Sequence, residues 1–489
     1  DAVMTLPAVS LLAKRAGPFI VSRDPGLALY RLAFGESASY LGDPAGMFAR
    51  LGLSLRLRKE RFDEAFLFQN AFAAAIVSFF AKKRVGYARD LRGPLLTSAI
   101  EPSKEILAAH EVFYHLNLLG GADGVDPAFS FPSIPPDSDN GGAYSSANSS
   151  AKSSTNDNAN DSANSSTNSS ANDSDNAALG EFLLLAKNSD FVMAAAPGAS
   201  FGGAKRAPLS LFAKTAELLL SDRPRGCLAI LGGASEAKDA NSLAEALKVS
   251  LKGRVFDLSG KTSLKEALGI LRLSSLVLAN DSGIMHLAGA AGAKTLAFIG
   301  PTDPVRTGPT GPDSAIMRAP RACGLAPCRR RECPLPKRLC LDDLKAEDAA
   351  AIADVLIKGP EGMPAGAPLG FPALLLAEAS PAARTPSGPE SDGPLRLPHG
   401  AEPSDMSAWE ALAASEGVDL GRSVLVGGDL DALGACSKAF GCDTVLHLGA
   451  SVPEGLAKGA FLPKMTAPTL AFALSYGRAL LAHRQKDKG

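Results

Sequence analysis

The sequence predicts an α/β protein with two doubly wound domains and a smaller α/β unit after them. Short apolar segments with strand character alternate with helical segments along most of the 489 residues, as in parallel sheets covered by helices. A Ser/Asn-rich stretch interrupts this alternation, and the length corresponds to about three domains at roughly 150 residues each. Two doubly wound domains joined by a linker predict a ligand-binding cleft between them.

The first domain is predicted to span residues 1–136. Its pattern predicts helices at 2–14, 27–34, 45–53, 70–82 and 103–119, and strands at 18–22, 37–41, 64–68 and 84–86. The longest apolar run, Ala71–Ala81, is too short to cross a membrane and has the character of a buried helix. We therefore expect no transmembrane segment.

Residues 137–178 differ from the rest of the chain in composition. The stretch consists almost wholly of Ser, Asn, Ala, Asp and Thr, and it has no apolar side chain large enough to anchor a core. We expect a disordered linker here. Its Asn-X-Ser/Thr triplets, such as the one at Asn148, arise by chance from this composition and do not by themselves indicate glycosylation.

The alternation resumes in a second domain, predicted at 179–358. Strands are expected at 191–196, 227–232, 255–258 and 276–280, with a final strand at 295–299, and helices at 209–221, 235–251, 264–272 and 283–291. A Pro/Gly-rich linker is expected at 359–404, with one candidate strand at 372–377. The third unit, 405–489, is predicted as helix 409–417, strand 423–426, helix 432–441 and strand 444–448.

Composition excludes some partners. The formal net charge is −1, from 50 Lys+Arg against 51 Asp+Glu, so the chain lacks the basic footprint of a nucleic-acid-binding protein. One Trp and six Tyr leave few platforms on which bases could stack. Seven cysteines, an odd number, are typical of a reducing compartment rather than a disulfide scaffold.

The strongest local signal lies where the strand 276–280 is followed by Asp281, Ser282 and Gly283. Ligands of open α/β sheets bind outside the carboxyl ends of strands, and the free N–H groups and dipole of the next helix favour a diphosphate. His286 lies one turn into that helix, on the same face as Ser282, where it could donate to a phosphate. The alternative is that Asp281 only caps the helix and His286 is a core histidine with its hydrogen bonds satisfied.

Two further loops follow strands of the same domain. The glycine-rich loop Pro197–Pro208 carries three candidate donor-binding residues: Ser200, Lys205 and Arg206. The alternative for this loop is a solvated basic segment, and the absence of GxxxxGK[ST] argues against a P-loop ATPase. Glu236, after the next strand, is a candidate partner for a ribose hydroxyl, although a surface glutamate is equally compatible with this position.

These loops occur together with recognisable motifs. The chain contains NDSGIMHLAGAAG from Asn280, PGASFGGAKRAP from Pro197, LSGKTSL from Leu258 and GYARDLRGPLLT from Gly86. Together, and in their order along the chain, these motifs resemble glycosyltransferase family 9, the bacterial lipopolysaccharide heptosyltransferases, and most closely its heptosyltransferase II-like members. The resemblance covers roughly 1–357 apart from the linker. Ala207 departs from the tryptophan usual in the family, which would loosen packing beneath the loop.

The resemblance implies a GT-B fold, in which two Rossmann-like domains face a cleft. It also implies inverting transfer of heptose from ADP-L-glycero-D-manno-heptose to the inner core of lipopolysaccharide. Asp1 matches the family's catalytic base, while Lys205 and the Ser282–Gly283 helix start would stabilise the departing diphosphate. No cofactor is expected to be required, since no DxD motif in the two Rossmann-like domains indicates a bound cation.

The resemblance also concerns the cellular setting and the start of the sequence. It implies a cytoplasmic enzyme at the cytoplasmic face of the inner membrane, with the lipid A-core acceptor as partner. Family members begin with a strand before the turn that holds the base. We therefore expect that strand, central to the first sheet, to be missing from this sequence and this form to be inactive.

Four cysteines with C-x4-C-x4-C-x6-C spacing follow the second domain's strands: Cys323, Cys328, Cys333 and Cys340. Four thiolates could bind zinc, but the usual C-x2-C knuckle is absent, so reduced structural thiols are the favoured interpretation. The neighbouring basic residues are candidates for contacting acceptor phosphates or an anionic membrane, or are simply solvated: Arg329, Arg330, Arg331, Lys337 and Arg338.

The third unit resembles haloacid dehalogenase-like phosphatases in its last motif. Asp429 and Asp431, after the strand 423–426, match the acidic pair that holds Mg²⁺ in that family. Alanines at 377 and 379 occupy the positions where the nucleophile motif needs aspartates, so an aspartyl-phosphate cannot form. We expect a degenerate, non-catalytic unit. A bifunctional transferase–phosphatase and a catalytically silent binding protein stay open as alternatives, as do the exact acceptor and the oligomeric state.

Overall fold

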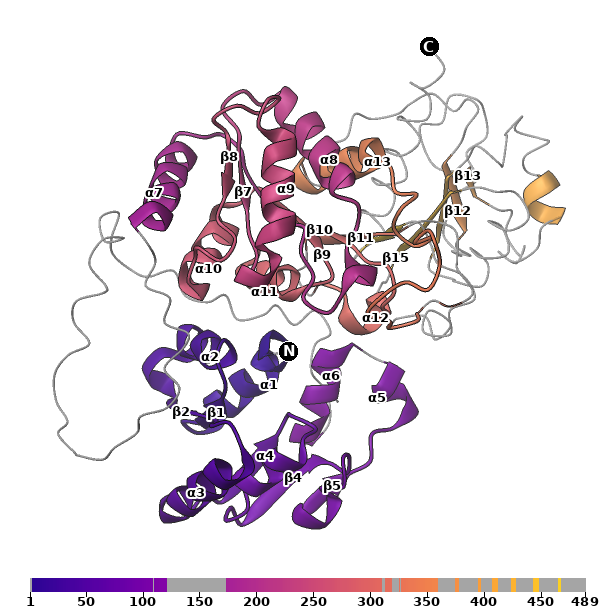
Figure 1. Cartoon of the computed structure of the whole chain (residues 1–489). Helices are drawn as coiled ribbons and strands as arrows, with labels where there is room; N and C mark the ends of the chain where they lie inside the picture. Colours follow the sequence, from indigo (N-terminus) through magenta and orange to yellow (C-terminus); the bar gives the residue numbers. More distant parts are fainter. Residues whose placement is uncertain are drawn as a thin grey trace.

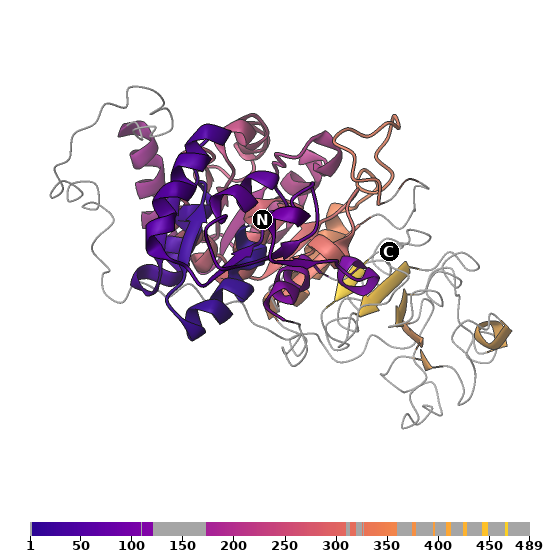
Figure 2. The ribbon, with the colours of Figure 1, turned by 90° about the horizontal axis from the view of Figure 1, so that it is seen from below.

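The computed structural model describes two stacked halves of the chain (Figure 1). The described residues are 2–108, 110–120, 173–309, 313–318, 325, 327–358, 374–377, 395–396, 407–411, 424–427, 443–447 and 465–467. Seen from below, the first half lies in front of the second, which agrees with this stacking (Figure 2).

The first half alternates short strands and helices as predicted. Its elements are α1 (Ala2–Arg15), β1 (Phe19–Ser22), α2 (Gly26–Phe34), η1 (Gly35–Ser37), β2 (Ser39–Gly42), α3 (Met47–Leu57), η2 (Arg58–Glu60), β3 (Glu64–Leu67), α4 (Phe72–Val77), β4 (Lys83–Tyr87), η3 (Gly93–Leu95), β5 (Ser98–Ile100), α5 (Lys104–Ala108), α6 (Glu111–Leu116) and η4 (Asn117–Leu119). Strand β5 was not predicted.

The strands of the first half form two separate parallel sheets, β1-β2 and β3-β4-β5. A cavity of about 1190 Å³ lies between them, and every residue of β1 and of β3 lines it. Both strands therefore present an edge to the cavity, and neither edge pairs with another strand of the described chain.

The prediction of one continuous helix at 103–119 is wrong, because the helical conformation is interrupted at His110. The backbone there is extended (φ −59°, ψ 144°), and the His110 Nδ1 atom accepts a hydrogen bond from the N–H of Val112, capping α6. Its Nε2 atom lies 3.1 Å from the carbonyl oxygen of Gly308 in the second half. This tertiary contact outweighs the helical pattern of the sequence.

The second half contains a parallel sheet with the strand order β11-β10-β9-β6-β7-β8. Its elements are α7 (Asp173–Lys187), β6 (Val192–Ala196), η5 (Gly203–Lys205), α8 (Leu209–Ser221), β7 (Cys227–Ile230), η6 (Ala234–Glu236), α9 (Ala237–Leu247), β8 (Val255–Asp257), α10 (Leu264–Leu273), β9 (Leu276–Asn280), α11 (Gly283–Ala291), β10 (Thr295–Phe298), α12 (Pro304–Thr307), β11 (Ser314–Met317) and α13 (Ala346–Lys358).

Two expectations for this half need correction. The strand at 295–299 is not the last of the sheet, since β11 pairs with it in parallel. The predicted linker 137–178 ends too late, because α7 already begins at Asp173. Asp, Ser and Asn are favoured at helix N-termini, so an apolar helix can extend backwards into such a sequence. Residues 137–172 lie outside the described residues.

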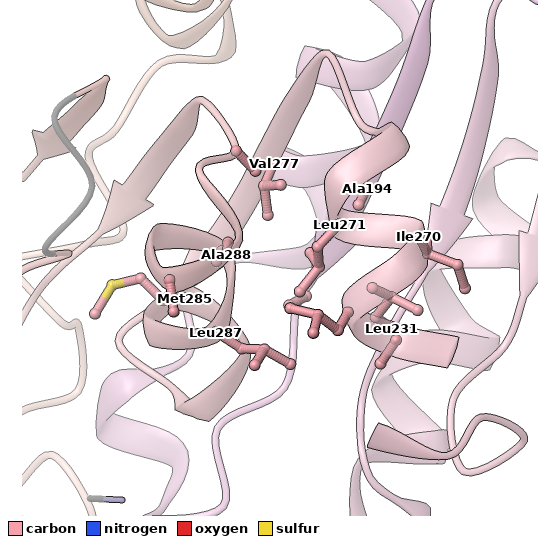
Figure 3. Close-up of a cluster of buried hydrophobic side chains, with 14 of the residues drawn as sticks. Ala194, Leu231, Ile270, Leu271, Val277, Met285, Leu287 and Ala288 are labelled. Carbon is pink, nitrogen blue, oxygen red and sulfur yellow. The ribbon is translucent and has the colours of Figure 1, made fainter. Parts of the chain in front are cut away.

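The core of the second half is continuous with the first half. Helices α8, α9 and α13 bury their apolar faces in one cluster, and α7, α10 and α11 contribute to another on the sheet. The second cluster includes Leu6 and Val9 of α1 and Leu29 of α2, so the halves share buried side chains. Figure 3 shows part of it: Ala194, Leu231, Ile270, Leu271, Val277, Met285, Leu287 and Ala288.

The C-terminal strands extend the same sheet. They are β12 (Leu374–Ala377), β13 (Leu395–Arg396), β14 (Val424–Gly427), β15 (Asp443–His447) and β16 (Met465–Ala467), and they add the order β13-β12-β14-β15-β16. Strand β16 pairs antiparallel with β11 and parallel with β15. Strands β13, inside the predicted linker 359–404, and β16 were not predicted. No helix among the described residues is long and apolar enough to cross a membrane.

Candidate functional site

The candidate site lies at the carboxyl edge of the second sheet, where three neighbouring strands end. Strand β6 continues into the loop Pro197–Pro208, β9 ends at Asn280, and β10 leads to Thr302. The buried Asn280 side chain holds the first loop in place. Its Nδ2 donates to the carbonyl oxygen of Pro197 at 2.6 Å, and its Oδ1 accepts from the N–H of Ala207 at 3.0 Å.

A buried ion pair forms the centre of this edge. The Lys205 Nζ lies 2.8 Å from Asp281 Oδ2, and the two side chains are 13% and 4% exposed. The Thr302 hydroxyl donates to the same carboxylate oxygen, and the Thr307 hydroxyl reaches it at 3.5 Å. On its other side the Lys205 ammonium lies 5.0 Å from the ring centroid of Phe201, within reach of a cation–π contact.

The N-terminus of α11 opens beside this pair. Ser282 is its N-cap residue, with extended backbone (φ −149°, ψ 170°) and no side-chain capping bond. A Cβ atom added to Gly283 would have no neighbour within 4 Å, so space adjoins the first N–H groups of the helix. These unpaired donors and the positive end of the helix dipole make the position suitable for an anion.

Two side chains of this region have polar atoms without a partner. Neither the buried Oγ of Ser282 nor the buried Nδ1 of His286 forms a hydrogen bond with any residue that the structure describes. Burial lowers the pKa of His286 from 6.5 to about 4, although the nearby Asp281 carboxylate acts in the opposite direction. The imidazole is therefore neutral at pH 7 and keeps one N–H to donate.

The structure thus brings together five predicted residues: Lys205, Asp281, Ser282, Gly283 and His286. It also bears on the structural alternatives for two of them, whose role at a donor stays a prediction. The helix is capped at Ser282, not at Asp281, whose carboxylate pairs with Lys205. His286 is not a core histidine with satisfied hydrogen bonds, since no described residue bonds its Nδ1.

Other predicted residues have different partners. The Arg206 guanidinium donates to the carbonyl oxygen of Ala199 and pairs with Asp239 at 2.9 Å. The Glu236 carboxylate accepts from the N–H of Gly233 at 2.9 Å. Ser200 is exposed. Their predicted contacts with a donor stay predictions, and Asp1, the predicted base, lies outside the described residues.

Three residues near the site were not singled out from the sequence, namely Thr302, Arg306 and Thr307, whereas the family resemblance includes a helix that begins at His110. Thr302 and Thr307 follow β10, whose carboxyl end adjoins that of β9, so their position after the next strand was the available signal. The His110 Nε2 atom contacts the carbonyl oxygen of Gly308, and the Arg306 guanidinium lies 3.5 Å from the Glu111 carboxylate. Helix α12 and the start of α6 therefore connect the two halves. Burial lowers the pKa of His110, so its ring is neutral and its Nε2–H can donate to Gly308.

The segment 327–340, which carries three of the cysteines, packs against the glycine-rich loop Pro197–Pro208, here called the lysine loop after Lys205. The N–H of Ala204 donates to the carbonyl oxygen of Arg331 at 2.9 Å, and the N–H of Gly203 donates to the Glu332 carboxylate at 3.1 Å. Gly202 has φ 153°, and a Cβ there would lie 2.3 Å from the Arg331 carbonyl oxygen. The Arg338 guanidinium donates to the carbonyl oxygen of Gly203 at 3.2 Å. Part of the predicted basic patch therefore clamps the loop.

The cysteines themselves give no metal centre in the described chain. Cys328 and Cys333 are free thiols, and together with the buried Cys340 they line one small cavity. No group of three or more His, Cys, Asp or Glu residues among those the structure describes is arranged to hold a metal ion. Cys323, the fourth predicted zinc ligand, lies outside the described residues.

Comparison with known proteins places this geometry in a family. Residues 50–339, more than half of the chain, match the model of glycosyltransferase family 9 (heptosyltransferase). Lipooligosaccharide heptosyltransferase 2 of Campylobacter jejuni is 34% identical over 176 residues, which are 36% of this chain and 54% of that protein. Lipopolysaccharide heptosyltransferase 2 of Salmonella typhimurium is 25% identical over 283 residues, 55% of this chain and 68% of that protein. The chain spans only about half or less of three lipooligosaccharide heptosyltransferase 2 proteins that it matches. The matched share is 54% and 51% of two Campylobacter jejuni proteins and 35% of one from Haemophilus influenzae.

Among solved structures, the Escherichia coli ADP-heptose lipopolysaccharide heptosyltransferase II superposes with a TM-score of 0.54 at 19% identity, covering 73% of this chain and 94% of that one. This likeness confirms the predicted α/β fold of the GT-B type with parallel sheets. Together with the family model, it leads to one conclusion: the chain belongs to glycosyltransferase family 9, the heptosyltransferase family.

Proposed function

We propose that this protein is an inverting glycosyltransferase that moves heptose from ADP-L-glycero-D-manno-heptose to the inner core of lipopolysaccharide. The observation that carries the proposal is the pairing of Lys205 with Asp281 beside the open N-terminus of α11. A cation, the first N–H groups of α11 and a neutral imidazole lie near one another here, and this combination suits a diphosphate leaving group. Family membership and the names of the relatives support the choice of a heptose donor.

The described residues account for the leaving-group side of the reaction. The bond between C1 of the heptose and the diphosphate oxygen breaks, and the acceptor hydroxyl oxygen forms a new bond to C1 while its proton passes to a base. Lys205 and the α11 N–H groups stabilise the negative charge that develops on the ADP oxygens. His286 donates its N–H to a phosphate oxygen. The family resemblance assigns the base to Asp1.

The setting and partners follow from the same resemblance. The acceptor is a lipid A-core molecule at the cytoplasmic face of the inner membrane, and no metal is required, because protein donors serve the diphosphate. The resemblance is distant and partial, so the proposal extends to the heptosyltransferase II-like class and leaves the exact acceptor position open.

We further propose that residues 405–489 form a degenerate haloacid dehalogenase-like unit without phosphatase activity. Strands β12 and β14 are adjacent and parallel, so the segments after Ala377 and Gly427 begin at the same sheet edge. This supports the predicted pairing of a nucleophile segment with the acidic pair at 429 and 431, which lie outside the described residues. Ala377 stands where a nucleophilic aspartate is needed, so phosphate release from heptose bisphosphate should be absent.

The test of the transferase proposal separates donor binding from turnover. Calorimetric titration with ADP probes the described part of the site, and Lys205→Ala should weaken ADP binding at least tenfold, whereas Lys248→Ala, at an exposed lysine paired with Glu245, should not. Release of ADP from ADP-heptose with a core acceptor probes the reaction. Absence of ADP release with every ADP-heptose and core acceptor would contradict the proposed function.

A further inference from the structure

Helix α3 carries a row of apolar side chains that face away from the protein. Phe48 is 90% exposed, and Met47, Leu51 and Leu55 are about half exposed, at 48%, 49% and 52%. At about 100° per residue these four side chains fall within one arc of roughly 100° on the helix surface. Large exposed apolar side chains gathered on one face indicate an interaction surface.

The same helix is held to the protein by its opposite face. Leu53, on the side opposite the row, is 5% exposed, and Ser54, which borders the row next to Met47, is 1% exposed. Helix α3 also packs against α4. Arg50 is fixed by a 2.6 Å ion pair with Asp43. The exposed row therefore lies on a helix that is already anchored, and it is not the core-facing side of a loose segment.

Positive charge flanks the row at its C-terminal end. Four exposed cationic side chains follow one another there: Arg56, Arg58, Lys59 and Arg61. Glu60 is the single carboxylate in the sequence 47–61. Within the described chain, no carboxylate forms an ion pair with Arg56, Lys59 or Arg61, so their charge is available to an external anion.

Position and shape add to this argument. Figure 1 places α3 at the lower end of the first half, on the side away from the second half. None of the four side chains of the row lines the cavity between the two sheets of the first half. Apolar side chains that protrude beside a cluster of cations are typical of helices that lie in the headgroup layer of a membrane.

We propose that α3 docks this protein on an anionic phospholipid bilayer. Phe48, Leu51 and Leu55 enter the boundary between headgroups and acyl chains, and Arg56, Lys59 and Arg61 contact lipid phosphates. This surface is separate from the basic segment at 329–338, part of which clamps the lysine loop. The proposal does not depend on the proposed transferase reaction.

Vesicle sedimentation with the full chain tests the proposal. The protein should bind vesicles of phosphatidylcholine mixed with phosphatidylglycerol and bind those of phosphatidylcholine alone far less. Phe48→Ser/Leu51→Ser should lower the partition coefficient by about tenfold or more, because two exposed apolar side chains no longer insert. Arg56→Gln/Lys59→Gln should lower it by about thirtyfold at low salt and less at high salt.

The matched control is Val249→Ser/Leu184→Ser, which removes two exposed apolar side chains, 90% and 71% exposed, from the second half. All three variants should keep the wild-type melting temperature, since the altered side chains are exposed. Equal binding of Phe48→Ser/Leu51→Ser and the control would overturn the proposal, as would equal binding to neutral and anionic vesicles. Loss of a dimer in Phe48→Ser/Leu51→Ser, measured without vesicles, would assign the face to a second copy of the chain instead.

Discussion

Replacing Lys205 by methionine removes the cation of the buried pair while keeping most of the side-chain volume. At the observed 2.8 Å, two unit charges interact by about 6 kcal/mol at an effective dielectric constant of about 20. The cost of burying the ammonium offsets part of this attraction. Breaking a buried pair by removing one partner typically costs about 3–5 kcal/mol, because it leaves the other charge uncompensated.

The environment of Asp281 places the expected loss at the lower end of that range. The hydroxyl of Thr302 continues to donate to the carboxylate, and that of Thr307 lies at 3.5 Å. We expect Lys205→Met to destabilise the protein by about 3 kcal/mol, which lowers the melting temperature by about 6 °C or more for a domain of this size. Lys205→Met/Asp281→Asn should recover most of the loss, since no isolated charge stays buried.

Differential scanning calorimetry of Lys205→Met, Asp281→Asn, the double variant and the wild type completes the cycle. Lys248→Met is the matched control, because that lysine is 70% exposed and its pairing with Glu245 should contribute little. ADP affinity should fall furthest in Lys205→Met, where the unpaired carboxylate faces the diphosphate. If Lys205→Met melts like Lys248→Met, or if the double variant melts no higher than Lys205→Met, the reasoning about this pair is refuted.

Three other predictions concern single features of the fold. His286 and His115 both have a pKa lowered by burial from 6.5 to about 4, so each favours the folded state less as the pH falls from 6.5 towards 4. Each histidine lowers the free energy of unfolding by about 3 kcal/mol over this pH range. His115→Gln should therefore flatten the dependence of melting temperature on pH between 6.5 and 4, and an unchanged slope would contradict this prediction. Gly202→Ala should weaken ADP binding and lower the free energy of unfolding by about 2 kcal/mol or more, because the added Cβ would meet the Arg331 carbonyl oxygen. Calorimetry measures both quantities, and wild-type ADP affinity would show that the contact with Arg331 does not position the loop. Asn280→Ala should cost about 2–4 kcal/mol in chemical unfolding, because buried groups at both ends of the loop lose their partner, and a loss below 1 kcal/mol would count against that role.

Elements whose conformation depends on neighbouring residues in the sequence were predicted correctly. Strand β9 and helix α11 were predicted with the bounds that the structure has, because a continuous apolar run ends at a polar Asp-Ser-Gly turn. The helix then ends at Gly292, whose φ of 76° is the left-handed conformation typical of a helix end. The grouping of Lys205 with Asp281 was also predictable in outline, since each follows a strand that ends at the same sheet edge.

Contacts between distant segments were not predictable in this way. The break at His110 depends on a carbonyl oxygen 198 residues further along the chain, and no periodicity in 103–119 records it. Arg206 was assigned to a ligand because it lies in a basic glycine-rich loop. Its partner Asp239 lies on α9, and a charged residue there is equally compatible with solvent. Side-chain partners across elements therefore needed the structure.

The four-residue segment α12 connects the two halves to the ion pair of the site. Thr307 directs its hydroxyl towards Asp281 at 3.5 Å, while Arg306 lies 3.5 Å from Glu111 in the first half. The carbonyl oxygen of Gly308, immediately after α12, faces His110 at 3.1 Å. A shift of the first half that breaks these contacts would move Thr307 away from the carboxylate. The position of the first half should therefore influence donor affinity, even though every residue that we assign to the diphosphate belongs to the second half.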